Sequence, residues 1–186
     1  MKPKNLDTWD PKFAPSFTPM EMLDKGVFMD CHYNVAIKGL PSEWYAHKNV
    51  TPRDEEPDVK KNHYGVKSRQ SLKEWQKNEW TTKDSPLGWW EWYVRYYLGR
   101  RLEKEDVWQI GRWRSFVARH MGQVRAGCKL SDKDCRPVQR QGLLQWAWDS
   151  SCEFTPEQLE ENLKRLGVST KNISTESLKP PPYLGW

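Results

Sequence analysis

The stretch WWEWYVRYY, residues 89–97, carries six aromatic side chains in nine positions, and it limits the possible folds more than any other segment. At 100° per residue, the six rings cover one helical face about 160° wide. Leu87, Val94 and Leu98 add an aliphatic stripe beside this face. A helix that is apolar on nearly every side is normally buried. The stretch therefore predicts a central helix whose rings form the core; the alternative is a platform that stacks nucleic-acid bases.

The apolar content of the whole chain is concentrated in aromatic residues. Leu, Ile, Val and Phe are scarce, whereas the chain contains 12 Trp and 7 Tyr residues. Each such ring can bury roughly 150–250 Å² of surface, so the rings can replace the missing aliphatic side chains. A length of 186 residues suits one domain built around a core of this kind.

Two segments, FTPMEMLDKG and FTPEQLEENLKRLG, share one helix-start pattern. Thr18 and Thr155 are suited to cap the first turn, a proline follows each, and Glu or Gln occupies the third helical position. Gly26 and Gly167 are suited to end these helices. Further helices are expected at 42–45, 71–80, from 86 with Ser85 as its cap, at 105–126, and from Asp134 or Cys135 to about 149.

Strand signals are weak, because no long stretch alternates apolar and polar residues. Residues 27–28 and 35–37 form at most a small β ribbon, and residues 48–63 read as an exposed polar loop. The sequence therefore predicts a mainly α, compact single-domain helical fold with an aromatic core and long loops. Its expected divisions are an N-terminal extension at 1–16, a helical domain at 17–167 and a Pro-rich tail at 168–186.

Positive charge is unevenly distributed along the chain. The formal net charge is +5, and the whole basic excess lies within residues 67–151. Arg outnumbers Lys in this region, which favours bidentate contacts with phosphate or carboxylate groups. Localised basic charge favours anionic partners such as nucleic acid or an acidic protein surface. The alternative is an ordinary solvated basic surface.

Several arginines fall on helical faces where they can meet an anion. Trp108, Arg112 and Arg119 share one expected ridge of the helix at 105–126. Arg136 and Arg140 share a face with apolar residues of the next helix, so each needs a carboxylate, a phosphate or access to water. The candidate site for anion or nucleic-acid binding comprises Arg100, Arg101, Trp108, Arg112, Arg119, Arg136 and Arg140.

Small side chains form a second pattern within the helix expected at 105–126. Gly111, Ser115, Ala118 and Gly122 recur at intervals of three or four residues. Such a stripe forms a groove that lets a neighbouring element approach closely. We therefore expect bulky rings of the central aromatic helix to fill this groove.

The sequence contains no catalytic or metal-binding signature. It lacks a phosphate-binding glycine loop, a nucleophile elbow and a paired-histidine zinc motif. Cys31, Cys128, Cys135 and Cys152 do not follow common zinc spacings and are expected to be free thiols. We therefore expect no metal, no cofactor and a non-enzymatic role; an enzyme would need a cleft with perturbed titratable groups.

The sequence also leads to an expectation about location. The opening residues lack the apolar segment of a secretion signal, and no apolar run is long enough to span a membrane. We therefore expect a protein of the cytoplasm or nucleus that is neither secreted nor inserted in a membrane.

The C-terminal residues carry a candidate partner motif. Pro180, Pro181, Pro182 and Tyr183 match the P-P-x-Y pattern, which WW domains bind as a polyproline helix. The alternative is a docked tail in which Tyr183 and Trp186 pack against the domain.

Several blocks of the chain together resemble a known kind of protein. The blocks are FAPSFTPMEMLDKGVF, YGVKSRQSLKEW, GWWEWYVRYYLGRR, IGRWRSFVARH and CRPVQRQGLLQWAWDS. The chain resembles a family of small, uncharacterised, Trp-rich eukaryotic proteins with no assigned activity. The resemblance implies a recurring single domain, and no functional residue can be transferred from it.

The charge pattern and the tail motif favour two functions. The leading expectation is a non-enzymatic binding protein whose Arg-rich helical face contacts nucleic acid or another phosphate-bearing polyanion. The alternative is a structural or adaptor protein in a larger assembly, with its basic face on an acidic protein and its tail on a WW-type partner.

Overall fold

The computed structural model describes residues 1–32 and 37–182, and every regular element in these ranges is a helix. The mainly α fold class is therefore confirmed. Residues 27–28 form a turn, and residues 35–36 of the second expected ribbon segment lie outside the described ranges. The elements are η1 (Leu6–Thr8), α1 (Pro19–Asp24), α3 (Ser42–Tyr45), η2 (Val59–Lys61), α4 (Leu72–Lys77), α5 (Trp89–Tyr97), α6 (Glu103–Gly127), α7 (Pro137–Gln145), α8 (Pro156–Leu166) and α9 (Thr175–Leu178).

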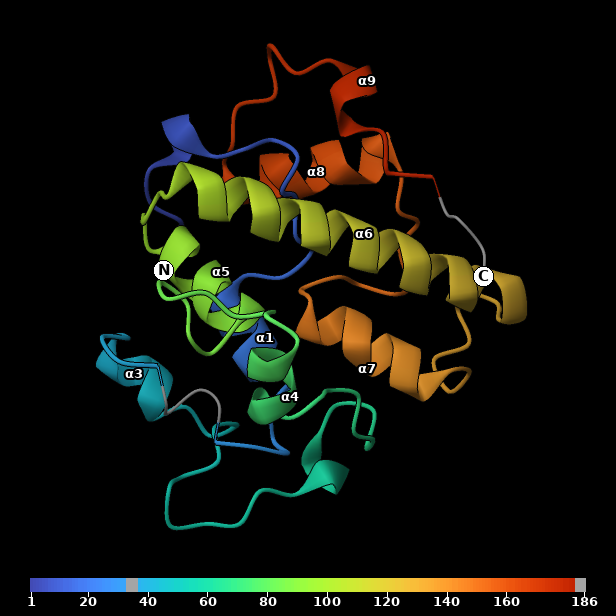
Figure 1. Ribbon diagram of the computed structural model, residues 1–186. Helices are drawn as coiled ribbons and strands as arrows, with labels where there is room; N and C mark the ends of the chain where they lie inside the picture. Colours follow the sequence, from blue (N-terminus) through green and yellow to red (C-terminus); the bar gives the residue numbers. More distant parts are fainter. Residues whose placement is uncertain (33–36, 183–186) are drawn as a thin grey trace.

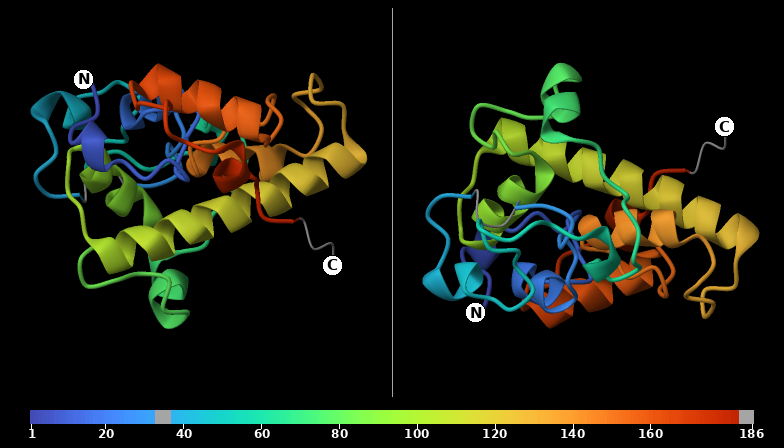
Figure 2. Two further views of the ribbon diagram at one scale, coloured as in Figure 1. Left: turned by 90° about the horizontal axis from the view of Figure 1, so that it is seen from above. Right: turned by 90° about the horizontal axis from the view of Figure 1, so that it is seen from below.

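The long helix α6 runs across the molecule, and the other helices lie around it (Figure 1). The helices α5 and α7 pack against α6, and α8 packs with α9. Figure 2 shows α4 standing out from the body beside the first half of α6. Within the described ranges, no helix is both long enough and apolar enough to cross a membrane.

The two threonine-capped helices form as their sequence pattern predicts. The hydroxyl oxygen of Thr18 accepts from the backbone N–H of Glu21 at 3.3 Å, and the Glu21 carboxylate accepts from the backbone N–H of Thr18 at 2.7 Å. Thr155 accepts from the backbone N–H of Gln158 at 3.3 Å. Gly167 ends α8 with a φ of 84°, a left-handed conformation that glycine adopts without steric cost.

The helix α5 begins later than its pattern predicts. Its cap is Gly88, with a φ of 90°, rather than Ser85. The backbone N–H of Ser85 instead donates to Thr82 Oγ1 at 2.9 Å, in the turn before the helix. The carboxylate of Glu91 accepts from the backbone N–H of Leu87 at 3.0 Å, which ties this turn to the first turn of α5.

The helix α7 is shorter than the expected span 135–149. Asp132 Oδ1 accepts the backbone N–H of Asp134 at 3.1 Å and of Cys135 at 3.2 Å, so these residues form a turn before the helix. Arg136 then caps α7 with a φ of 57°. Ala147, with a φ of 56°, adopts a left-handed conformation two residues after the end of α7 and turns the chain away from the helix.

Phe13 lies at the centre of the aromatic core. The six rings of α5 are at most 2% exposed, which confirms that they form the interior. The Phe13 ring is fully buried, and the segment 1–16, expected as an extension, therefore supplies part of the core. The rings around Phe13 have centroid distances of 5.1–6.2 Å and belong to Trp9, Trp89, Trp92, Tyr93, Tyr96 and Trp113.

Polar atoms of the core rings hold distant segments together. Trp92 Nε1 donates to Asp106 Oδ1 at 2.8 Å, which joins α5 to the first turn of α6. The Tyr96 hydroxyl accepts from the backbone N–H of Asp10 at 2.8 Å. Burial raises the pKa of Tyr96 to about 12, so this phenol stays neutral at ordinary pH.

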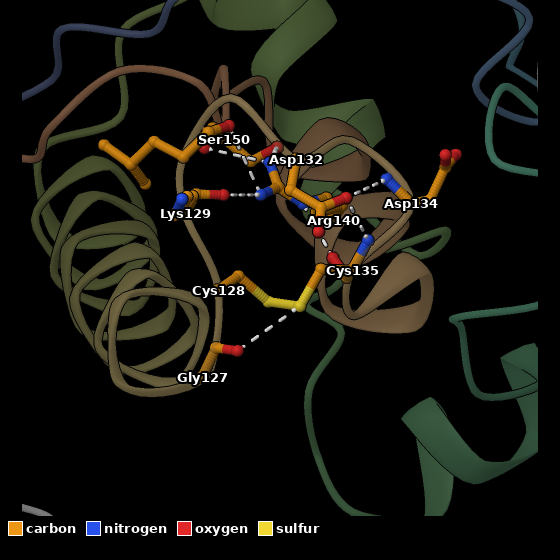
Figure 3. The surroundings of a disulfide bond; sticks show 9 residues. Gly127, Cys128, Lys129, Asp132, Asp134, Cys135, Arg140 and Ser150 are labelled. Carbon is orange, nitrogen blue, oxygen red and sulfur yellow. Dashed lines mark hydrogen bonds between the residues drawn. A yellow bond between two sulfur atoms is a disulfide. The ribbon is translucent and has the colours of Figure 1, made fainter.

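A disulfide joins Cys128 and Cys135 between the ends of α6 and α7 (Figure 3). The expectation of free thiols is therefore wrong for this pair, whereas Cys152 is a free thiol. The sequence reasoning failed because it used only the spacing of the cysteines and the absence of a secretion signal. The turn before α7 brings the two Cα atoms to 5.9 Å, a normal separation for a disulfide.

Candidate functional site

Arg140 of the predicted anion site is an interior residue. It is 1% exposed, and its Nε donates to the carbonyl oxygen of Cys135 at 2.8 Å. Its terminal nitrogens donate to the hydroxyl of Ser150 at 2.9 Å and to the carbonyl oxygens of Lys129 and Leu130 at 3.3 and 3.4 Å. As Figure 3 shows, this guanidinium binds the loop closed by the disulfide and is not available to a phosphate.

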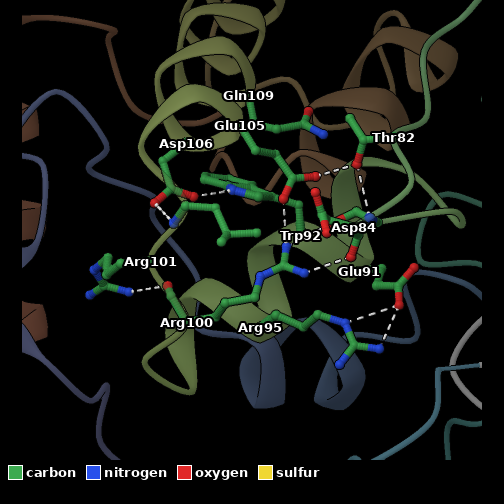
Figure 4. A network of polar contacts seen from close by, with 12 residues as sticks. Thr82, Asp84, Glu91, Trp92, Arg95, Arg100, Arg101, Glu105, Asp106 and Gln109 are labelled. Carbon is green, nitrogen blue, oxygen red and sulfur yellow. Dashed lines mark hydrogen bonds and ion pairs between the residues drawn. The ribbon is translucent and has the colours of Figure 1, made fainter.

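Arg100 fastens the loop before α5 to the start of α6 (Figure 4). Its guanidinium pairs with Glu105 at 2.9 Å and donates to the carbonyl oxygen of Asp84 and the hydroxyl of Ser85 at 2.6 and 2.7 Å. Glu105 also accepts from the hydroxyl of Thr82. Arg100 therefore has a structural role in the fold.

Arg101 also has a structural role, because it binds the N-terminal segment. Its guanidinium lies 3.8 Å from the centre of the Tyr96 ring. It donates to the carbonyl oxygen of Tyr96 at 2.6 Å and to that of Asn5 at 2.9 Å. Arg101 thus holds residues near the N-terminus against the end of α5.

Arg136 is exposed but lies apart from the rest of the predicted site. Its guanidinium covers Gly127, where an added Cβ would come within 2.8 Å of Arg136 Nε. Gly127 is at the end of α6, roughly 28 Å along the helix axis from Trp108. Arg136 therefore does not share a surface with the tryptophan end of α6.

The remaining three predicted residues lie together on α6, as the sequence pattern indicates. The Arg112 guanidinium lies over the rings of Trp108, Trp75 and Trp146, at 4.5, 5.3 and 5.6 Å from their centroids. One of its terminal nitrogens donates to the carbonyl oxygen of Trp80 at 3.0 Å. These contacts hold the cation across three ring faces, an arrangement worth about 0.5–2 kcal/mol per favourable pair.

These residues line a cavity of about 860 Å³ enclosed by α4, α5, α6 and α7 and by the loops before α4 and α5. We call it the tryptophan pocket. Its volume falls in the range of roughly 300–1,000 Å³ that is typical of ligand sites. Six indole rings contribute to its lining, and they belong to Trp75, Trp80, Trp89, Trp90, Trp108 and Trp146.

The lining of the tryptophan pocket is positively charged. Arg69, Arg112 and Arg119 contribute to it, and within the described ranges no aspartate or glutamate does. Arg69 Nε pairs with Asp30 Oδ2 at 3.1 Å, behind the lining. Arg119 is exposed. The pocket therefore favours a ligand that carries negative charge.

The mouth of the pocket is unusually apolar for a protein surface. Trp80 and Trp108 are 39% and 37% exposed, and Leu72 and Val107 are exposed beside them. All four side chains line the same pocket. Clustered exposed apolar side chains of this kind mark binding sites.

The stripe of small residues on α6 is not filled as expected. A Cβ built at Gly111 meets no atom within 4 Å. Gly111 and Ser115 form part of the pocket wall instead. The rings of α5 pack on another side of α6, so this part of the groove stays open and adds to the volume of the pocket.

Sequence reasoning missed the wall of the pocket that α4 and the end of α7 supply. The rings of Trp75 and Trp146 have a centroid distance of 6.2 Å, although they are far apart in the sequence. Neither lies in a motif, and their proximity follows only from how the helices pack. A local signal for this half of the site does not exist.

The tail is docked at least as far as α9. Leu178 is buried, and the Arg114 guanidinium donates to the carbonyl oxygens of Lys179 and Lys12. Pro180, Pro181 and Pro182 follow at the surface, whereas Tyr183 and Trp186 lie outside the described residues. The WW-ligand motif therefore stays a prediction.

Comparison with known proteins does not connect the chain to a family. No protein-family model matches it, and no curated protein and no solved structure shows significant similarity. The resemblance to small Trp-rich eukaryotic proteins therefore stays an expectation, and the tryptophan-rich core is the part that the structure supports. In the described ranges, no cluster of three or more His, Cys, Asp or Glu side chains is placed to hold a metal ion.

Proposed function

We propose that this protein is a non-enzymatic binding protein that holds single-stranded nucleic acid at the tryptophan pocket. One observation supports the proposal most directly: Arg112 is held across three tryptophan rings, in a pocket that two further arginines line. Aromatic faces stack bases and guanidinium groups attract phosphates, and these two interactions are how proteins bind single strands.

The shape of the pocket favours a single strand over a duplex. The pocket lies between α4, α5, α6 and α7, and two of its rings, those of Trp80 and Trp108, are 39% and 37% exposed. A base within a duplex is stacked between its neighbours and cannot enter such a pocket. An unpaired base can enter, and stacking on an aromatic ring is worth about 1–3 kcal/mol per base.

Arg119, an exposed arginine on α6, is suited to contact the strand's backbone. Arg119 lines the pocket, and within the described ranges no ion pair or hydrogen bond is recorded for its guanidinium. Each phosphate that such a group neutralises releases counterions, so binding weakens as salt increases. The anion-binding face is thus smaller than the seven residues predicted from the sequence and centres on Trp108, Arg112 and Arg119.

A salt titration tests the proposal. The affinity of a labelled strand of about 12 nucleotides is measured by fluorescence anisotropy between about 50 and 200 mM salt, with a duplex of the same sequence as the comparison. We expect tighter binding of the single strand and a negative slope of log affinity against log salt. Arg119→Gln should reduce this slope by about one. Arg125→Gln is the matched control, because Arg125 is also on α6 but pairs with Glu153 outside the pocket.

A second variant blocks the pocket. Gly111→Leu places a side chain where a Cβ meets no neighbour, so it should fill the cavity without disturbing the fold. We expect it to weaken binding of the strand at least tenfold, roughly the loss of one stacked base. Ala126→Leu, an exposed substitution on α6 outside the pocket, should leave the affinity unchanged. Absence of binding at low salt, or full binding by Gly111→Leu, would contradict the proposal.

The adaptor alternative retains one supporting observation, the apolar mouth formed by Leu72, Trp80, Val107 and Trp108. An acidic protein segment with apolar side chains would also fit this surface. Protein partners that co-purify after nuclease treatment, and that are lost in Gly111→Leu, would favour this function. A synthetic peptide of residues 176–186 offered to a WW domain tests the tail motif separately.

A further inference from the structure

One side of α6 carries a row of exposed residues spaced four apart. The row consists of Glu103, Val107, Gly111, Ser115 and Arg119, and all five are exposed. We call it the α6 row. Residues four apart lie on one ridge of a helix, and this ridge extends about 24 Å along the helix axis. The described part of the chain therefore leaves a long ridge of α6 uncovered.

Val107 is the most exposed of the large apolar side chains in the described ranges, at 64%. Base stacking gives a role to the exposed ring of Trp108, but it gives none to an aliphatic side chain. Exposed apolar side chains that lie together mark protein–protein contacts. Val107 therefore indicates a protein partner that packs against the ridge.

The α6 row is complementary to itself when its direction is reversed. It begins with the acidic Glu103 and ends with the basic Arg119, while the bulky Val107 and the small Ser115 lie at equal distances from Gly111. Beside an antiparallel second copy centred on Gly111, Glu103 faces the partner's Arg119 and Val107 faces the partner's Ser115. A twofold dimer requires this kind of patch, because the same surface must fit its own copy.

We propose that two copies of this protein associate through the α6 row, with their α6 helices antiparallel and crossing at Gly111. A Cβ built at Gly111 meets no atom within 4 Å, so the crossing point is open to the partner. Because glycine has no side chain, the two helix axes can approach to about 8 Å, the short end of the usual range. The side chain of Val107 then packs beside the partner's Ser115.

The charges at the two ends of the row favour this partner. Two exposed cations elsewhere are paired within the chain, Arg125 with Glu153 and Arg165 with Glu21. For Glu103 and Arg119, no ion pair or hydrogen bond of the side chain is recorded among the described residues. The dimer contains two Glu103–Arg119 contacts, which oppose the repulsion between two chains of net charge +5. Opposite charges across an interface also fix its register.

The position of α4 is compatible with the antiparallel arrangement. Figure 2 shows α4 beside the first half of α6. In an antiparallel pair, the two α4 helices therefore lie at opposite ends of the crossing and do not collide. Leu72 of α4 and Trp80 just after it are exposed, and each α4 brings them towards the second half of the partner's α6.

The proposed dimer covers the tryptophan pocket. Val107, Gly111, Ser115 and Arg119 belong both to the α6 row and to the lining of the pocket. A ligand of the pocket and a second copy of the chain therefore compete for the same surface. Self-association does not depend on the proposed function, but it would regulate that function by closing the pocket at high protein concentration.

Sedimentation equilibrium of the full chain tests the inference. We expect a monomer–dimer equilibrium with a dissociation constant of about 10–100 μM, because one pair of helices buries less area than a permanent dimer needs. Protein concentrations on both sides of this range show the transition. A protein that stays monomeric throughout, or that forms a larger assembly without a dimer, would overturn the proposal.

Charge reversals test the pairing. Glu103→Arg alone and Arg119→Glu alone each create two like-charge contacts in the dimer and should weaken it about tenfold or more. The double variant restores both ion pairs with reversed polarity and should return the dissociation constant to within about threefold of the original value. The two positions are about 24 Å apart along one helix, so a pair within one chain cannot produce this rescue.

Glu157→Arg is the matched control. Glu157 is exposed and lies in the first turn of α8, as Glu103 lies in the first turn of α6. The two substitutions therefore change the net charge and the charge near a helix start in the same way. Glu157→Arg should leave the dimer unchanged. Equal effects of the two substitutions, or a double variant that stays as weak as the single variants, would contradict the antiparallel pairing.

The outcomes for the dimer and for strand binding can be separated. Glu103 does not line the pocket, so Glu103→Arg should keep the affinity for a single strand while it loses the dimer. A saturating strand should convert wild-type dimers into monomers, and a strand bound to an intact dimer would overturn this arrangement. If no strand binds but the charge reversals behave as expected, the proposed function fails and the dimer stands.

Discussion

Arg140 and Ser150 are joined inside the protein, where the guanidinium donates to both the carbonyl and the hydroxyl oxygen of Ser150, at 3.2 and 2.9 Å. Arg140 donates hydrogen bonds to the loop between α6 and α7. Its acceptors are backbone carbonyl oxygens and the hydroxyl of Ser150. A charge buried in this way is tolerated because each of its N–H groups finds an oxygen. Arg140 therefore stabilises the fold and does not recognise a ligand.

Arg140→Met is expected to lower the free energy of unfolding by about 3 kcal/mol or more, because it leaves several buried carbonyls without donors. Arg140→Lys should restore little of this loss, since an ammonium cannot reach acceptors spread around a planar guanidinium. Urea unfolding measures both effects. Arg136→Met, at the exposed neighbouring position, is the control and should change stability by less than about 0.5 kcal/mol. A loss of less than about 1 kcal/mol in Arg140→Met would refute the interior role.

Reduction of the Cys128–Cys135 disulfide is expected to destabilise the protein by about 2–3 kcal/mol, as for the opening of a short loop. The same loop carries the carbonyls of Lys129 and Leu130 that bind Arg140. The effects of Cys135→Ser and Arg140→Met should therefore be less than additive in a double-mutant cycle. Thermal unfolding with and without reductant measures the first effect. Cys152→Ser, at a free cysteine, should leave the response to reductant unchanged, and strict additivity would contradict the coupling.

Phe13→Ala is expected to lower the free energy of unfolding by about 3–5 kcal/mol, because the ring is fully buried and its removal leaves a cavity among the rings that surround it. Phe13→Leu should cost less, since it keeps most of the volume. Chemical unfolding followed by tryptophan fluorescence measures both. Val138→Ala, at an exposed site, is the control. A cost below about 1 kcal/mol for Phe13→Ala would show that the N-terminal segment is not part of the core.

The stability of the protein is expected to fall at alkaline pH. Burial raises the pKa of Tyr96 and of Tyr97 to about 12, above the value of 10.0 that applies in the unfolded chain. The unfolded state therefore loses these protons first, and the stabilisation that is complete below pH 10 disappears as the pH rises towards 12. Urea unfolding across this range measures the loss. The decline should be shallower in Tyr96→Phe, and an equally steep decline in that variant would exclude Tyr96 as a source.

Local sequence patterns predicted the helix ends that depend on neighbouring residues. The cap at Thr18 with its partner Glu21, and the glycine end at Gly167, need only residues within a few positions of one another. The same locality explains the errors: Ser85 has the right residue type for a cap, but its hydroxyl is taken by Arg100 and its N–H by Thr82. Ser85 therefore binds the partners that the tertiary structure brings to it, and it does not cap the helix.

The sequence by itself determined that the rings of residues 89–97 are buried. Nearly every side of such a helix is apolar, and the hydrophobic effect favours removing that surface from water. Only the tertiary structure decided which of the candidate arginines remain at the surface, since the packing encloses Arg140 among carbonyl oxygens and leaves Arg119 exposed. It also decided that Trp75 and Trp146 meet. Hydrophobic periodicity acts along one helix, whereas a pocket requires separate helices to pack.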